Sequence, residues 1–365
     1  MTTIILVVGA ILLFILLLLK YYPAFGGKLS KEERRALNQS SNFSNGKFVN
    51  QIPTSMNTGF ITTLSILRDF MGRNPKRRPD RPIPMETFDS LFIQGNKQAK
   101  ITWFGHSAFL LELDGKSLLF DPMFGRSPSP FPLVGGKRYS GDLPLNVEEL
   151  PVIDAVFLSH DHYDHLDYGS IKKLKDKVKR FFVPLGVSKH LERWGVNQEI
   201  IKEHDWWSEF EWEGLTLACT PARHFSGRSL SDRNSTLWCS WVVIGKQSKV
   251  YFSGDSGYGP HFKEIGETYG PFDYTLMECG QYDNRWSSIH MMPEETVQAH
   301  LDVKGDIMIP IHWASFTLAL HDWTDPIERV KKEALEKDIA ISTPKIGEAV
   351  MIGSVEYPKS TWWRS

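Results

Sequence analysis

The sequence has few cysteines, almost no net charge and no internal repeat. Three cysteines occur in 365 residues, and no two of them form a CxxC pair. This count excludes a disulfide framework, and we expect reduced, mostly buried thiols. The formal charge is −1 at pH 7, so the charge balance excludes a broadly basic protein and gives no indication of nucleic acid as a partner. The hydrophobic content of 41% is that of an ordinary globular protein with a large core.

Charged side chains are absent from residues 1–19, and most of this run is aliphatic. Nineteen residues in a helix span about 28 Å, close to the hydrocarbon thickness of a bilayer. No Lys or Arg precedes the run, which disfavours a cleaved signal peptide, the alternative reading. We therefore expect residues 1–20 to form a single transmembrane anchor. Lys20, Lys28 and Lys31 follow it, so the positive-inside tendency places the rest of the chain in the cytoplasm.

The remainder divides into a connector and a compact domain. Residues 21–95 are polar and proline-rich, with helical spacing of apolar residues over Ile61–Phe70. Residues 96–365 alternate strand-like and helix-like segments, and a proline at 293 marks a helix start. This alternation predicts a two-sheet α/β architecture. The expected strands are Ile101–Phe104, Phe109–Leu113, Ser117–Phe120, Asp154–Leu158, Arg180–Val183, Leu215–Cys219, Leu237–Ile244, Lys249–Ser253, Tyr274–Glu278 and Asp306–Ile311, and a helix is expected over Ile171–Val178.

A short segment rich in metal-binding side chains follows the expected strand Asp154–Leu158. It reads Ser159-His160-Asp161-His162-Tyr163-Asp164-His165-Leu166. In an extended segment His160 and His162 project to the same side, where both can hold one ion. Asp164 and His165 follow a turn and can serve a second ion. Imidazole and carboxylate are ligands suited to Zn²⁺, with iron or manganese as substitutes.

One loop cannot satisfy two ions, so further ligands must come from the ends of other strands. His224, Asp255 and His312 each lie where an expected strand gives way to a loop. Any one of them is as readily a structural residue as a ligand. With the first four they make a set of seven predicted metal ligands.

The order HxHxDH followed by distant His, Asp and His resembles the metallo-β-lactamase superfamily. Within it, several segments resemble the N-acyl-phosphatidylethanolamine-hydrolysing phospholipase D group. They are Lys47–Asn50, Trp103–Ser107, Ser159–Tyr168, Thr220–Arg228, Phe252–Tyr258, Ile289–Glu295 and Ile311–Phe316. The resemblance covers roughly residues 43 to 330 and implies an αββα sandwich of two mixed sheets flanked by helices. The animal enzymes of this group differ in lacking a spanning N-terminal helix.

The resemblance also implies roles for individual residues. One zinc would be bound by His160, His162 and His224. The other would be bound by Asp164, His165 and His312, with Asp255 bridging the two. His290 would contact the phosphate of the substrate, and Tyr163 and Tyr168 would line the site. A homodimer is implied as well.

The expected function is that of a dizinc hydrolase acting on a phosphodiester of a membrane lipid. Two zinc ions roughly 3.5–4 Å apart hold a bridging water as hydroxide near neutral pH, and Asp164 would orient it. The favoured reaction converts N-acyl-phosphatidylethanolamine to N-acylethanolamine and phosphatidic acid. A lactonase or another phosphodiesterase on the same scaffold is the alternative. A scaffold without activity is disfavoured because none of the seven predicted ligands is missing.

Other polar residues leave more than one reading open. His106 either supports a ligand or is a hydrogen-bonded core residue. Arg223 and Arg228 either meet a phosphate or pair with surface acids. Asp161 and Asp167 are candidates for fixing the imidazole tautomers. The remaining histidines lack ligand spacing and are expected to be structural: His190, His204, His261, His300 and His321.

Overall fold

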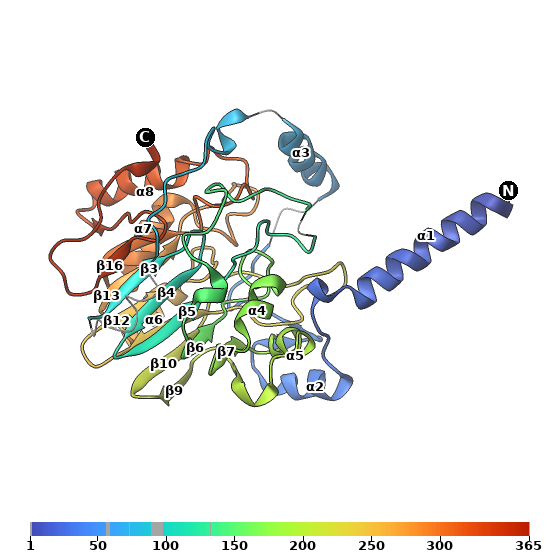
Figure 1. Ribbon diagram of the computed structural model, residues 1–365, viewed down its shortest axis with the longest axis horizontal. Helices are drawn as coiled ribbons and strands as arrows, with labels where there is room; N and C mark the ends of the chain where they lie inside the picture. Colours follow the sequence, from blue (N-terminus) through green and yellow to red (C-terminus); the bar gives the residue numbers. More distant parts are fainter. Residues whose placement is uncertain (1, 56–58, 73, 89–97, 132, 365) are drawn as a thin grey trace.

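Two seven-stranded sheets face each other in the computed structural model, which describes residues 2–55, 59–72, 74–88, 98–131 and 133–364 (Figure 1). The first sheet has the order β16-β3-β4-β5-β6-β7-β8. Its strands are β3 (Lys100–Trp103), β4 (Phe109–Leu113), β5 (Lys116–Phe120), β6 (Ala155–Phe157), β7 (Phe181–Pro184), β8 (Ile201–His204) and β16 (Ala349–Met351).

The second sheet has the order β15-β14-β13-β12-β11-β10-β9. Its strands are β9 (Ser208–Trp212), β10 (Leu215–Thr220), β11 (Ser240–Ile244), β12 (Lys249–Phe252), β13 (Phe272–Glu278), β14 (Gly305–Ile311) and β15 (Ala340–Ile341). Both sheets are mixed: β5 to β8 are parallel, as are β12 to β15, and the other pairs in each sheet are antiparallel.

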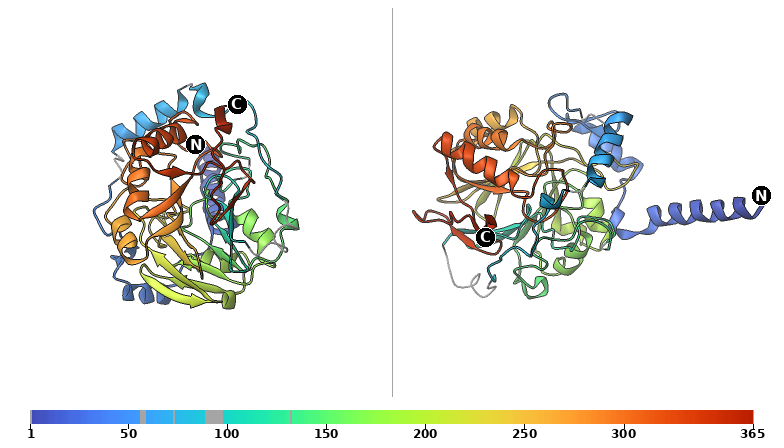
Figure 2. Two further views of the ribbon diagram at one scale, coloured as in Figure 1. Left: turned by 90° about the vertical axis from the view of Figure 1, so that its left-hand side faces the viewer. Right: turned by 90° about the horizontal axis from the view of Figure 1, so that it is seen from above.

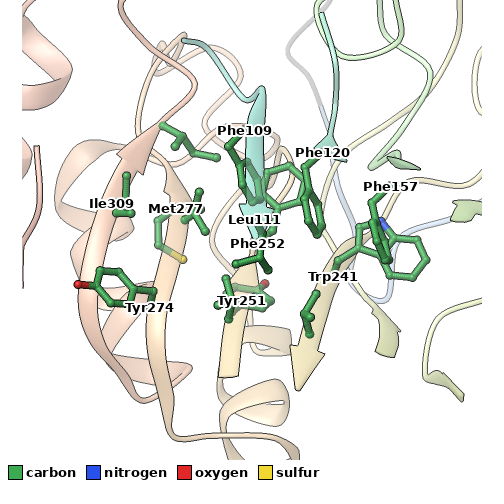
Figure 3. Packing of buried hydrophobic residues seen from close by; sticks show 14 of the residues in the cluster. Phe109, Leu111, Phe120, Phe157, Trp241, Tyr251, Phe252, Tyr274, Met277 and Ile309 are labelled. Atoms are coloured by element: carbon green, nitrogen blue, oxygen red, sulfur yellow. The ribbon is translucent and has the colours of Figure 1, made fainter. Parts of the chain in front are cut away.

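The main core lies between the two sheets (Figure 3). Phe109 and Leu111 of β4 point into it, whereas Leu110 between them belongs to a second cluster on the outer face. Successive side chains of a strand point to opposite faces, so a strand buried on both sides is apolar throughout. Phe109 and Phe120 stack with ring centroids 4.4 Å apart, and Phe252 of the facing sheet meets Phe109 edge-on at 5.2 Å.

Helices cover the outer faces of both sheets, which gives the αββα order of layers (Figures 1 and 2). On the first sheet, α4 (Tyr168–Leu174) and α5 (Ser188–Arg193) bury Ile171, Leu174 and Leu191 in the second cluster. The helices of the second sheet are α6 (His261–Thr268), α7 (Pro293–Asp302) and α8 (Asp325–Glu336). Pro293 begins α7, where its missing N–H costs nothing.

The N-terminal part contributes α1 (Thr2–Tyr21), α2 (Lys31–Ala36), the hairpin β1 (Phe43–Ser44) and β2 (Lys47–Phe48), and α3 (Phe60–Met71). Helix α1 projects away from the body of the molecule (Figure 1). Its residues 3–21 have a mean hydropathy of 2.9 and none of the span is buried. By length and composition α1 can cross a membrane, although a signal sequence passes the same criteria.

The predicted two-sheet architecture is confirmed, and most predicted strands lie within one residue of their observed bounds. The Leu237–Ile244 prediction is too long, because β11 begins at Ser240. The predicted helix Ile171–Val178 is displaced: α4 begins at Tyr168, after the Asp167 side chain accepts from Ser170 N and caps the first turn. Strands β8, β9, β15 and β16 were not predicted. The predicted boundary at residues 95 and 96 lies outside the described residues, and Phe43 and Phe48 of the connector are buried in the main core.

Candidate metal centre

Strands that run in the same direction bring the predicted ligands to one edge of the fold. β10, β12, β13 and β14 run in one direction, so their C-terminal ends meet. His224 follows β10, Asp255 follows β12 and His312 follows β14 directly. Gly254 makes the turn before Asp255 with φ +57°, and a Cβ there would lie 2.6 Å from Cys239 O. His312 itself adopts φ +64°, a strained conformation for a histidine.

The loop after β6 supplies the other four predicted ligands. His165 N and Leu166 N both donate to His162 O, at 3.1 and 2.8 Å, which closes a tight turn over the loop. Arg228 secures the loop from outside, because its Nη1 donates to Asp161 O and, at 2.8 Å, to Leu166 O.

His160, His162 and His224 form the first group. The Nε2 atoms of His160 and His224 lie 2.8 and 3.2 Å from Nδ1 of His162. The three ring nitrogens converge within 4.8 Å of one another. Three imidazoles that point at one another are expected where they share a cation.

The second group contains His106 as well as Asp164, His165 and His312. His106 Nε2 lies 2.9 Å from Asp164 Oδ2 and its ring is fully buried. The structure thus decides between the two readings of His106: it holds a predicted ligand. Asp255 lies between the groups, with Oδ2 3.1 Å from His165 Nε2, 3.8 Å from His224 Nε2 and 3.9 Å from His160 Nε2.

The donor set fits a bound metal. His312 Nε2 is buried and has no hydrogen-bond partner among the described residues, and His165 Nε2 faces two predicted ligands, Asp255 Oδ2 at 3.1 Å and Asp164 Oδ2 at 3.5 Å. Buried polar atoms are normally satisfied, and imidazole nitrogens beside carboxylates are metal ligands by type.

The second nitrogens of the same rings are held by the protein. His165 Nδ1 lies 2.7 Å from Asp121 Oδ2, and Asp121 also accepts from Ser159 N at 2.7 Å. Further contacts are His160 Nδ1 with Ser159 Oγ (2.9 Å), His224 Nδ1 with Ile289 O (2.9 Å), and His312 Nδ1 with both Ser107 Oγ (3.1 Å) and Asp255 Oδ1 (3.0 Å). Contacts of this kind fix the tautomer and leave the other nitrogen for a metal.

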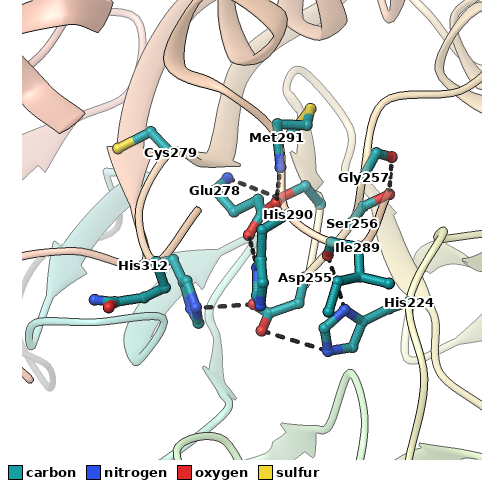
Figure 4. A network of polar contacts seen from close by, with 12 residues as sticks. His224, Asp255, Ser256, Gly257, Glu278, Cys279, Ile289, His290, Met291 and His312 are labelled. Carbon is teal, nitrogen blue, oxygen red and sulfur yellow. Dashed lines mark hydrogen bonds and ion pairs between the residues drawn. The ribbon is translucent and has the colours of Figure 1, made fainter. Parts of the chain in front are cut away.

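His290 lies beside this set (Figure 4). Its ring stacks on that of His312 at 5.3 Å, and Glu278 Oε2 lies 2.8 Å from its Nδ1. Glu278 is the last residue of β13, is fully buried, and also accepts from Met291 N at 2.8 Å. Burial raises the pKa of Glu278 well above its ordinary value.

Burial also dominates the electrostatics of the ligands. It lowers the pKa of His162 to about 4 and those of His160, His224 and His312 well below the ordinary value, so these rings are neutral at pH 7. Burial lowers the pKa of His165 too, but Asp255, Asp164 and Asp121 outweigh it and raise that pKa well above normal. Neutral imidazole is the form that binds a metal, so the first four rings are ready to bind one, and His165 must release a proton when a metal binds.

The group formed by the predicted metal ligands and His290 is exposed to solvent on one side, called the open edge. The side chains of Asp164 and His290 retain 14% and 13% exposure, whereas Asp255 and His312 are buried. Tyr163 belongs to the ligand loop, and its hydroxyl donates to Arg228 O at 2.6 Å, so its role in lining the site stays a prediction. Tyr168 begins α4 and packs against Trp194 at 5.4 Å, and no described contact joins it to the ligand set. Its role in binding stays a prediction.

Two pairs of residues differ from their expected roles. Asp161 accepts from Gly227 N and Thr236 Oγ1, and Asp167 caps α4, so neither touches a ligand histidine. Arg223 and Arg228 neither pair with a surface acid nor reach the open edge: Arg223 binds Pro53 O and Thr54, and Arg228 binds Ala24 O. They hold the connector on the domain. The five histidines without ligand spacing all hydrogen-bond within the scaffold, as expected.

Three supporting residues were missed by sequence reasoning: Asp121, Glu278 and Asn50. The first two are carboxylates at the C-terminal ends of strands parallel to ligand-bearing strands, a signal present in the sequence. Asn50 donates to His224 O at 2.8 Å and accepts from His224 N at 3.1 Å. This clamp gives the Lys47–Asn50 segment a physical role.

The sequence is similar to that of known proteins whose family agrees with the observed fold. The model of the beta-lactamase superfamily domain matches residues 116–313. An uncharacterised protein of Mycobacterium tuberculosis is 41% identical over 94% of this chain and 92% of its own. N-acyl-phosphatidylethanolamine-hydrolyzing phospholipase D 1 of Caenorhabditis elegans is 35% identical over 75% of this chain and 81% of its own.

Among solved structures, isothiocyanate hydrolase from Delia radicum gut bacteria covers 69% of this chain and 98% of its own, with a TM-score of 0.55 and 21% identity. That likeness shows the fold. With the matched family model and the His/Asp set at the edge of the sheets, the chain belongs to the metallo-β-lactamase superfamily of metal-dependent hydrolases.

Proposed function

We propose that this protein hydrolyses the phosphodiester of N-acyl-phosphatidylethanolamine, giving N-acylethanolamine and phosphatidic acid. The C. elegans relative, 35% identical, carries this activity in its name. The conversion is a phospholipase D reaction: water adds to phosphorus and the bond to the ethanolamine oxygen breaks.

We infer that two zinc ions occupy the centre, one on His160, His162 and His224 and the other on Asp164, His165 and His312, with Asp255 shared. When bound, such ions lower the pKa of water and polarise a phosphoryl oxygen. His106 orients the Asp164 carboxylate toward the open edge. Glu278 holds His290 through Nδ1, which leaves Nε2 to contact a phosphate oxygen. Tyr163 and Tyr168 would line the approach.

The exposed apolar face of α3 carries the lipid part of the proposal. Ile61, Leu64, Leu67 and Met71 are exposed by 83%, 49%, 55% and 70%, and they lie on one side of the helix by their spacing. A contiguous apolar surface of this kind marks a membrane or partner contact. Ser65 and Asp69 lie on another side, where Arg285 Nη1 binds them at 3.2 and 2.8 Å.

This ion pair ties the helix to the segment that leads to His290. Helix α3 also lies on the side of the body from which α1 projects (Figures 1 and 2). A chain anchored by α1 would thus present α3 and the open edge of the centre to the same bilayer, with the catalytic domain on the cytoplasmic side. We retain a homodimer as part of the proposal.

The test uses the full chain in uncharged detergent micelles. Bound zinc is measured by mass spectrometry, and release of N-acylethanolamine from its phospholipid is followed. We expect about two zinc ions per chain and turnover that His162→Ala abolishes together with metal. His290→Ala should retain metal but lower turnover about 100-fold, as expected for loss of a group that binds the transition state. His204→Phe, which keeps the ring stack on Phe210, is the control.

Bound zinc without lipid turnover would refute the substrate and direct attention to lactones and other phosphodiesters. Failure to bind metal would refute the mechanism itself.

A further inference from the structure

A second concave surface lies apart from the residues of the metal centre. Its walls are formed by residues 75–82 of the connector on one side and by residues 126 and 137–141 on the other, and the hollow between them measures about 630 Å³. The Tyr139 hydroxyl lies 2.8 Å from Arg77 O, and Ile83 N donates to Tyr139 O at 3.3 Å. The walls are therefore fixed to each other, and the hollow has the size of a small-ligand site.

Five cations line this hollow against one carboxylate. The cations are Arg78, Arg81, Arg126, Lys137 and Arg138, and the acid is Asp80. Within the described part of the chain, none of the five forms a salt bridge. Like charges gathered in a concavity raise its potential and attract an anion.

Arg138 is the buried member of the five cations, and the other four are exposed. It is only 5% exposed, and its Nη1 has no hydrogen-bond partner among the described residues. Its Nη2 donates to Met123 O at 2.6 Å and Gly125 O at 3.3 Å, and its guanidinium lies 4.7 Å from the Phe316 ring. Burial lowers the pKa of Arg138 to about 10. These contacts fix the charge of Arg138 beside the hollow, where it adds to the positive potential that attracts an anion.

We propose that this hollow binds a phosphate-bearing anion, either a free phosphate compound or the headgroup of an acidic phospholipid. Guanidinium forks match the paired oxygens of phosphate, and four of the five cations are arginine. Arg81 belongs to one wall and Arg126 to the other, and we assign both as donors to the phosphate group. The hollow shares no residue with the set of metal ligands. The proposal therefore does not depend on which substrate the metal centre hydrolyses.

The test is calorimetric titration of the full chain in uncharged micelles with its metal centre loaded. Inorganic phosphate and dihexanoylphosphatidic acid are titrated separately. The critical variant is Arg81→Glu/Arg126→Glu. The control, Arg35→Glu/Lys202→Glu, makes the same charge change at two exposed cations elsewhere. His162→Ala removes phosphate binding by the metal centre.

We expect a binding component that weakens at least tenfold in Arg81→Glu/Arg126→Glu and persists in the control and in His162→Ala. Binding of both titrants would identify phosphate itself as the ligand, and binding of the lipid alone would identify the headgroup. The proposal is overturned if the component is missing, unaffected by the critical variant, or weakened equally by the control. If the charge reversal impairs folding, Arg81→Gln/Arg126→Gln must still weaken binding at least threefold.

Discussion

Replacing Asp121 with asparagine isolates the contribution of a residue that touches no metal. Asp121 is fully buried, and its two oxygens have separate tasks. Oδ1 accepts from Ser159 N, while Oδ2 accepts from Ser159 Oγ at 2.5 Å and contacts His165 Nδ1 at 2.7 Å. Asparagine has a single oxygen. Its NH₂ group must therefore face either the Ser159 N–H or the His165 ring.

Either orientation is costly. If the asparagine NH₂ group faces the backbone N–H of Ser159, two buried donors oppose each other, which costs about 1–3 kcal/mol of stability. If the asparagine NH₂ group faces the ring, His165 Nδ1 must accept a hydrogen bond from it. The proton of the ring then lies on Nε2, which cannot bind a metal. Loss of such a supporting contact typically costs about 10–100-fold in metal affinity, or about 1.4–2.7 kcal/mol. We expect a reduction in this range for Asp121→Asn.

The assay is zinc competition against a chromogenic chelator, with circular dichroism to verify folding. Asp167→Asn is the matched control, because asparagine also caps a helix and Asp167 contacts no predicted ligand. Equal zinc affinity in Asp121→Asn and Asp167→Asn would refute the reasoning that Asp121 sets the His165 tautomer.

Three further predictions concern stability. Asn50→Ala should lose about 1–3 kcal/mol of unfolding free energy, because both backbone groups of His224 lose their partner; an unchanged denaturation midpoint would contradict this. Burial lowers the pKa of His300 to about 4, so its contribution to stability is present above pH 6.5 and lost as pH falls towards 4, by up to about 3 kcal/mol. A His300→Gln variant of the metal-free protein should therefore show a flatter decline of melting temperature between pH 7 and 4.5 than the metal-free wild type. Chelation of the metal should lower the melting temperature, since a ligand at about 100 times its Kd stabilises by about 2.7 kcal/mol; a melting temperature unmoved by chelator would argue against a bound metal.

The metal ligands were predicted from residue type and from position at the ends of expected strands. Imidazole and carboxylate bind metals in any fold, so His160, His162, Asp164 and His165 could be chosen from one short segment. The distant residues His224, Asp255 and His312 were chosen for their place at strand ends, and the structure brings all seven together. The alternation of strands and helices likewise sufficed for the two-sheet architecture.

Tertiary structure alone decided which residues support that centre. Asp121 meets His165 across 44 positions, and Asn50 meets His224 across 174. The place of Asp121 at a strand end can be read from the sequence, but its pairing with His165 cannot, because β-sheet pairing and loop packing set such contacts. The same holds for Arg228, whose buried contacts with Ala24 and Asp161 replace the expected phosphate or surface acid.

The sequence by itself thus determined the ligand chemistry and the class of fold, because both depend on side-chain type and local periodicity. The partner of each imidazole, the side on which α3 lies and the cations gathered around Arg138 were decided by the tertiary structure, because a hydrogen bond or a charge cluster depends on distance in space rather than on distance along the chain.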